Sequence, residues 1–177
     1  YLSCTRCNRL ARYDQPDAFI RVGKRYRCLA DHGKGTRSDS MTAITRSTRK
    51  QPVAIPAPFV VACANGHLDD FPWGKYVHRG KLCEAKSTAL TLRHRGQTSG
   101  VEDLWVNCTH CKKGRSLQAA FAEDQKTTAL GACTAAQPWL GRDAHEESCG
   151  AELHTTLRGA SNLYFSRTQS ALSIPDW

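Results

Sequence analysis

Two closely spaced cysteine pairs, Cys4-Thr-Arg-Cys7 and Cys108-Thr-His-Cys111, constrain the fold of this chain most. A CxxC pair lets two thiolates hold one tetrahedral zinc ion, and two further ligands from elsewhere in the chain complete the site. The chain has nine cysteines in 177 residues. An odd count, with no charged-then-apolar signal peptide, disfavours a secreted disulfide scaffold. We therefore expect a reduced, cytoplasmic protein whose thiols bind metal.

The remaining cysteines and three histidines complete three sets of four ligands when they are grouped by spacing. The first predicted set is Cys4, Cys7, Cys28 and His32; the second is Cys63, His67, His78 and Cys83; the third is Cys108, Cys111, Cys133 and Cys149. These are Cys3His, Cys2His2 and Cys4 sets. In the third set, His145 is an alternative to one of the last two cysteines. The grouping uses every cysteine once.

Four protein ligands close a zinc site, whereas a catalytic zinc ion keeps one position open for water. We therefore expect about three structural zinc ions and no enzymatic activity. The chain has no Walker A loop, no HExxH pair and no GxSxG elbow, so the commonest hydrolase motifs are missing. Hydrophobic residues make up 40% of the chain and aromatic residues 8%. Metal binding would compensate for this lean core, because it contributes folding free energy.

The apolar pattern predicts short elements joined by loops. Alternation with period two predicts strands over 88–94, 104–108 and 152–157, and an apolar run predicts a strand over 55–63. A short helix is expected up to His78, capped by Asp69 or Asp70, and another is expected after Ser116. The predicted fold class is a small, zinc-rich α+β domain.

Positive charge is concentrated in the first fifty residues, which hold 12 Lys and Arg against 4 Asp and Glu, while the whole chain carries a net charge of +9. We predict a basic, zinc-ribbon-like segment over residues 1–50 with a polar loop over 33–52. A zinc-rich α+β domain follows over residues 53–177, and the whole is expected to be a segment of a longer protein. Such a charge bias favours a polyanion partner, most simply DNA. The alternative is a solvated arm without a partner.

Candidate contacts to nucleic acid or to a partner protein are basic or polar side chains near predicted turns. They are Arg21, Lys24, Arg25, Arg27, Lys112, Lys113, Arg115, Arg158 and Asn162. Each set has a structural alternative, since a charged cluster can be a solvated face and the 159–162 turn can satisfy its own strands. No run of about 18 apolar residues occurs, so no membrane contact is expected.

Several longer motifs, in order, resemble the DrmB family of the DISARM anti-phage defence system. They are residues 59–73 (FVVACANGHLDDFPW), 115–117 (RSL), 137–141 (QPWLG), 158–165 (RGASNLYF) and 170–175 (SALSIP). The resemblance covers most of the chain, from Cys4 to Pro175. It implies a zinc-binding accessory protein that works with a superfamily 2 helicase, resembling DrmA, on phage DNA.

Three functions are therefore weighed. The first is a non-catalytic zinc-binding module that helps a helicase engage DNA. The second is a purely protein–protein scaffold whose basic charge meets an acidic partner. The third is a zinc-dependent hydrolase or nuclease, which would need a site with three protein ligands and an open position.

Overall fold

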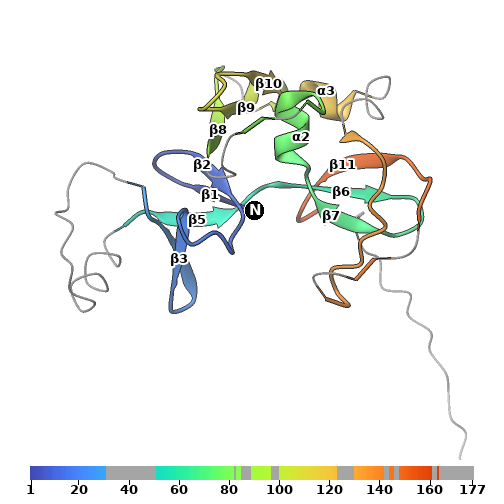
Figure 1. The fold of residues 1–177 in the computed structure, drawn as a ribbon, viewed down its shortest axis with the longest axis horizontal. Helices are drawn as coiled ribbons and strands as arrows, with labels where there is room; N and C mark the ends of the chain where they lie inside the picture. Colours follow the sequence, from blue (N-terminus) through green and yellow to red (C-terminus); the bar gives the residue numbers. More distant parts are fainter. Residues whose placement is uncertain are drawn as a thin grey trace, which may run out of the picture.

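The computed structural model describes residues 1–30, 51–81, 83–84, 89–96, 100–122, 130–141, 144–145, 148–160 and 163. Within these residues the chain forms one sheet of eight strands and one of three, with two short α-helices (Figure 1). All registered strand pairs are antiparallel. The expectation of a small domain of short strands and short helices is confirmed, with strands dominating.

The larger sheet has the strand order β10-β9-β8-β2-β1-β5-β4-β3. Its strands are β1 (Leu2–Cys4), β2 (Arg9–Ala11), β3 (Phe19–Val22), β4 (Arg25–Cys28), β5 (Val53–Pro56), β8 (Leu90–His94), β9 (Leu104–Cys108) and β10 (Gly114–Ser116). β5 pairs with β1 and β4, so strands from both sides of the predicted boundary at residues 50–53 share one sheet. The division into residues 1–50 and 53–177 stays a prediction, and most of the polar loop lies outside the described residues.

The smaller sheet consists of β11 (Leu153–Leu157), β6 (Phe59–Cys63) and β7 (Leu68–Asp70), in that order. Leu153 is the register partner of Cys63, which brings the C-terminal part of the chain beside β6. The single strand expected over residues 55–63 is two strands, β5 and β6. They are separated by Ala57 and by Pro58, which has no backbone N–H to give to a ladder. The chain crosses from one sheet to the other at this break (Figure 1).

Helix α2 (Trp73–His78) and helix α3 (Gln118–Phe121) lie where short helices were expected. The predicted cap of the first is wrong: the residue before it is Pro72, with no side-chain cap, while Asp70 belongs to β7. Asp70 is instead the register partner of Val60 in the smaller sheet. At α3, the backbone N–H of Gln118 donates to the Ser116 hydroxyl at 3.1 Å, so this serine supports the start of the helix.

An aromatic group holds α2 against both sheets. The Phe71 ring centroid lies 4.5 Å from that of Trp73 and 5.1 Å from that of Tyr76, and all three side chains are fully buried. The Tyr76 hydroxyl donates to the Ser116 carbonyl, just before α3. Since α2 comes directly after β7 and packs on β9 and β10, it carries its last residue, His78, from the smaller sheet towards the larger one.

The buried residues form two clusters. The main cluster joins α2, α3, β8, β9 and the smaller sheet, and the second surrounds Leu2, Cys4, Phe19 and Cys28. Cysteines belong to both clusters. All nine cysteines therefore lie in the packed interior or directly against it.

Candidate metal centres

The first CxxC pair forms a tight knuckle between β1 and β2. The backbone N–H groups of Arg6 and Cys7 point at the Cys4 sulfur, at 3.4 and 3.5 Å. Asn8 follows with φ of 59°, in the left-handed region that lets the chain reverse. Donated N–H groups stabilise a thiolate, so this turn prepares the sulfur of Cys4 to bind a cation.

Cys28, at the end of β4, completes a group that we call cluster 1 (Cys4, Cys7 and Cys28). The three sulfurs all lie within 4.8 Å of one another, and the Cys7 and Cys28 sulfurs are 3.8 Å apart. Burial raises the pKa of the Cys28 thiol to about 12, so without a cation this thiol stays neutral. His32, predicted as the fourth ligand, lies outside the described residues.

The second CxxC pair repeats the geometry of the first. Lys112, directly after Cys111, has φ of 61°, and the Cys108 N–H donates to the Lys113 carbonyl at 2.8 Å. A hydrogen bond from the Lys113 backbone lowers the pKa of the half-buried Cys111 thiol to about 7. The two CxxC pairs, far apart in the chain, thus form similar turns. Two features are common to both, namely the CxxC spacing and a residue with left-handed φ directly after the second cysteine.

His78 and Cys83 meet this second knuckle and form cluster 3 with it (His78, Cys83, Cys108 and Cys111), whose ligand atoms all lie within 4.8 Å of one another. The Nδ1–H of His78 donates to the Gly74 carbonyl one turn back in α2, at 2.7 Å. Its Nε2 is buried and has no hydrogen-bond partner. A histidine held through one ring nitrogen, with the other facing thiols, has the arrangement of a metal ligand.

Cys63 and His67 flank the turn between β6 and β7, and the Cys63 sulfur lies 3.3 Å from the His67 Nδ1. Gly66 makes this turn possible, since its φ of +87° is strained for a residue with a side chain. The Cys63 N–H donates to the His67 carbonyl at 3.1 Å, which closes the turn. Both ring and sulfur therefore point to one place at the end of β6.

Cys133 and Cys149 approach the same place and complete cluster 2 (Cys63, His67, Cys133 and Cys149), again with all ligand atoms within 4.8 Å of one another. The sulfurs of Cys63 and Cys149 are 3.9 Å apart, and the Asn65 side-chain amide donates to Cys149 at 3.3 Å. Burial raises the pKa of the Cys133 thiol to about 11. A hydrogen bond from the Ala151 backbone lowers that of Cys149 to about 7.

The predicted grouping of clusters 2 and 3 is wrong. The sequence set Cys63, His67, His78 and Cys83 is divided between two places, and so is the set of the last four cysteines. The physical reason is the path of the chain: α2 carries His78 to the knuckle after β9, while the pairing of β11 with β6 brings Cys149 to Cys63. The two clusters are nested, because the ligands of cluster 3 all lie between the two halves of cluster 2 in the sequence.

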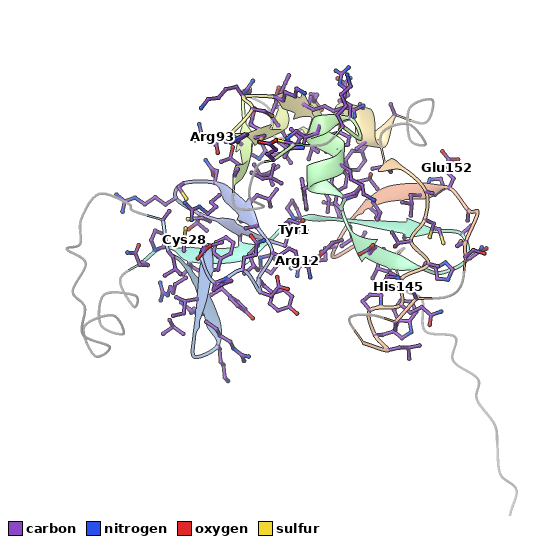
Figure 2. All side chains as sticks on the ribbon, in the orientation of Figure 1. Tyr1, Arg12, Cys28, Arg93, His145 and Glu152 are labelled. Atoms are coloured by element: carbon purple, nitrogen blue, oxygen red, sulfur yellow. The ribbon has the colours of Figure 1, made fainter. Side chains whose placement is uncertain are left out.

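The alternative ligand His145 lies beside cluster 2 but outside its group of ligand atoms. Its Nδ1 is 3.1 Å from the Thr134 carbonyl oxygen. Figure 2 shows His145 at the opposite end of the molecule from Cys28 of cluster 1.

The sulfur separations fit a tetrahedral metal ion. With a Zn–S distance of about 2.3 Å, two sulfurs on one zinc ion lie about 3.8 Å apart. The sulfurs of Cys7 and Cys28 lie 3.8 Å apart, and those of Cys63 and Cys149 lie 3.9 Å apart. The three thiolates and one imidazole of clusters 2 and 3 are soft and borderline donors, which zinc accepts well. A cation bound here would displace the protons of the neutral thiols, so its affinity falls as the pH is lowered.

Six of the predicted nucleic-acid contacts are exposed side chains, and one of these, Arg21, also donates from its Nε to the Gly23 carbonyl at 3.2 Å. Arg21, Lys24, Arg25, Lys112, Lys113 and Arg158 are exposed. Arg27 donates to the Gln51 carbonyl at 2.7 Å, and the Arg115 guanidinium lies 4.3 Å from the centre of the Tyr76 ring. These two arginines thus have structural partners. Asn162 lies outside the described residues.

Sequence reasoning missed a basic group on the outer face of β8 and β9. Arg93, directly across from Trp105, and Arg95, just beyond the end of β8, are exposed. The signal was present for Arg93, since the strand predicted over 88–94 already placed it on the face opposite the apolar positions. In the part of the chain that the structure describes, no helix is long and apolar enough to cross a membrane.

Comparison with known proteins gives two findings. Residues 1–165 match the family described as a domain of unknown function, DUF8724. Over 120 residues the chain is 39% identical to the DISARM protein DrmB of Bacillus paralicheniformis. The aligned region covers 68% of this chain and 20% of that protein. The chain therefore spans about a fifth of the length of this curated relative.

Proposed function

Because the chain belongs to the DUF8724 family, with a DISARM protein among its relatives, we propose that it is a zinc-stabilised, non-catalytic module of an anti-phage defence complex. It helps a helicase of the superfamily 2 class to engage DNA. The helicase partner follows from the resemblance to the DrmB family, while the zinc and the DNA contact are argued from the residues.

The observation that carries the zinc sites is the buried Nε2 of His78. An imidazole nitrogen without a partner in the interior costs free energy, about 1–3 kcal/mol, unless something binds its lone pair. Its neighbours in cluster 3 are thiols, which are themselves ligands. Clusters 2 and 3 each offer four ligands from the protein, and a closed tetrahedral set supports a structural role rather than catalysis.

The DNA contact is supported by the hairpin of β3 and β4. Arg21, Lys24 and Arg25 are exposed around its turn. Beside them, the Tyr13 and Tyr26 rings pack edge to face with centroids 6.2 Å apart, and Tyr13 is 46% exposed. Clustered cations attract phosphates, and an exposed aromatic ring adds a surface on which a base can stack.

Neutralising the hairpin cations together (R21Q, K24Q and R25Q) is expected to weaken DNA binding by the metal-loaded chain. Each lost phosphate contact reduces the slope of log K against log salt by about 0.9 for duplex DNA, so the slope falls by up to about 3. Fluorescence anisotropy with a labelled duplex over a salt series measures this change.

The matched control neutralises three exposed cations at the end of α2, namely Lys75, Arg79 and Lys81. It changes the net charge equally and is expected to leave the slope nearly unchanged. Equal losses in both variants would show a general charge effect and would contradict a specific contact at the hairpin.

A protein–protein scaffold is the second candidate, favoured by one observation. Trp139 and Leu140 are 52% and 68% exposed on a tight turn next to cluster 2, and exposed tryptophans are frequent anchors in protein interfaces. If the unmodified chain binds no DNA even at low salt, this second function replaces the first.

A further inference from the structure

The outer face of β8 and β9 carries a group of side chains that no part of the proposed metal sites uses. Thr91 pairs with Asn107 across the two strands, and Arg93 pairs with Trp105. The alternate residues Leu92 and Val106 are buried in the main core. Since successive side chains of a strand point to opposite faces, the side chains of these two pairs share the other face. Thr91 is buried there, whereas Arg93 is exposed.

Arg95 is held in place on this face. Its guanidinium carbon lies 4.7 Å from the centre of the Trp105 ring, and its Nη2–H donates to the Asn107 side-chain oxygen at 2.7 Å. Its backbone N–H donates to the Asp103 carbonyl at 2.8 Å, which continues the ladder of β8 and β9. Ring, amide and backbone together orient the guanidinium, which loses little further freedom when it binds a ligand.

Gly114 on β10 maintains this arrangement. It pairs with Asn107, and a Cβ at Gly114 would come within 2.4 Å of the Asn107 side-chain oxygen that accepts from Arg95. A larger residue would therefore displace the amide that anchors the guanidinium. The absence of a side chain at Gly114 leaves room for the anchor.

We propose that Arg95 and Arg93, supported by Trp105, form a second phosphate-binding site that takes the phosphodiester backbone of a nucleic acid. A guanidinium has five N–H donors, and one of those of Arg95 is used by Asn107. The others suit the paired oxygens of a phosphate group. The second cation follows two residues earlier on the same face, in Arg93.

One acidic group lies close by. Asp103 is opposite Arg95 in the ladder, and its carboxyl group fills the space that a Cβ at Gly96 would take. Asp103 lies at one end of this face, next to Arg95. Arg93 and Trp105 lie on the other side of Arg95, towards the middle of the two strands. An approaching phosphate therefore meets the two guanidinium groups on the side away from this carboxylate.

The site deepens the proposed DNA-binding function and can be tested apart from the hairpin. R95Q is expected to weaken binding of a labelled oligonucleotide about tenfold at low salt, and to reduce the salt slope by about 0.7–0.9. R95K keeps the charge, so the slope should stay while the affinity falls, because lysine lacks the planar fork. R79Q, which neutralises an exposed arginine directly after α2, is the matched control and should bind normally.

The fluorescence of Trp105 distinguishes a binding site from a merely structural role of this face. Adding the oligonucleotide should change tryptophan emission in the unmodified chain, and W105F should abolish that change while the metal content stays the same. Unchanged affinity in R95Q, alongside weaker binding in the hairpin variant, would overturn this site and leave the proposed function standing. A response to inorganic pyrophosphate but not to the oligonucleotide would also overturn it.

Discussion

Removing the metal is expected to unfold this chain. A structural zinc site contributes an apparent 10–16 kcal/mol of binding free energy in small zinc-dependent domains, whereas the whole stability of a domain is about 5–15 kcal/mol. Here all nine cysteines lie in or against the two buried clusters, so loss of the ions leaves buried thiols and the unpartnered His78 Nε2 in the core. No disulfide bond stabilises either sheet, since all nine cysteines are free.

The measurement is far-ultraviolet circular dichroism together with the dispersion of amide signals in NMR spectra, recorded while a strong zinc chelator is added. Both signals should be lost together and should return when zinc is restored. The same chelator already saturated with zinc is the control and should change nothing. A folded chain after elemental analysis has shown that the metal is gone would contradict the structural role.

The nested grouping predicts opposite outcomes for two double variants. C63S with C149S removes two ligands from cluster 2 alone, so one tightly held ion per chain should be lost. C63S with C83S removes one ligand from each of clusters 2 and 3, so two ions should be weakened. The grouping by sequence spacing predicts the reverse, because it places Cys63 with Cys83 and Cys149 elsewhere.

Elemental analysis after dialysis against a moderate chelator counts the ions that remain in each variant. C83S with C111S, both in cluster 3, is the matched control and should behave like the first double variant. If C63S with C149S loses two ions and C63S with C83S loses one, the nested grouping is wrong.

The local parts of the fold could be predicted from the sequence, since they depend on neighbouring residues. The strand at residues 104–108 is found as expected, and the helix that ends at His78 is present. Alternation and short-range turn chemistry determine such elements. The predicted helix cap at Asp69 or Asp70 is wrong because Asp70 belongs to β7, where it pairs with Val60.

The grouping of the ligands could not be predicted from spacing. It depends on which sheet each strand joins, and that is decided by distant partners. Pro58 divides one apolar run between two sheets, and the register of Leu153 with Cys63 then brings Cys149 to the end of β6. Spacing finds pairs such as Cys108 and Cys111, but it does not say which distant pair lies opposite them in the fold.

The most direct test of the central claim, two nested clusters of three thiolates and one imidazole each, is ¹¹³Cd NMR of the unmodified chain after cadmium replaces the native metal. The chemical shift of each ion reports how many sulfurs bind it, so no variant has to fold. Clusters 2 and 3 predict that their two ions both resonate in the range of three-thiolate sites. One ion in the range of four thiolates and another in the range of two would contradict the nested grouping and restore the sets that sequence spacing predicts.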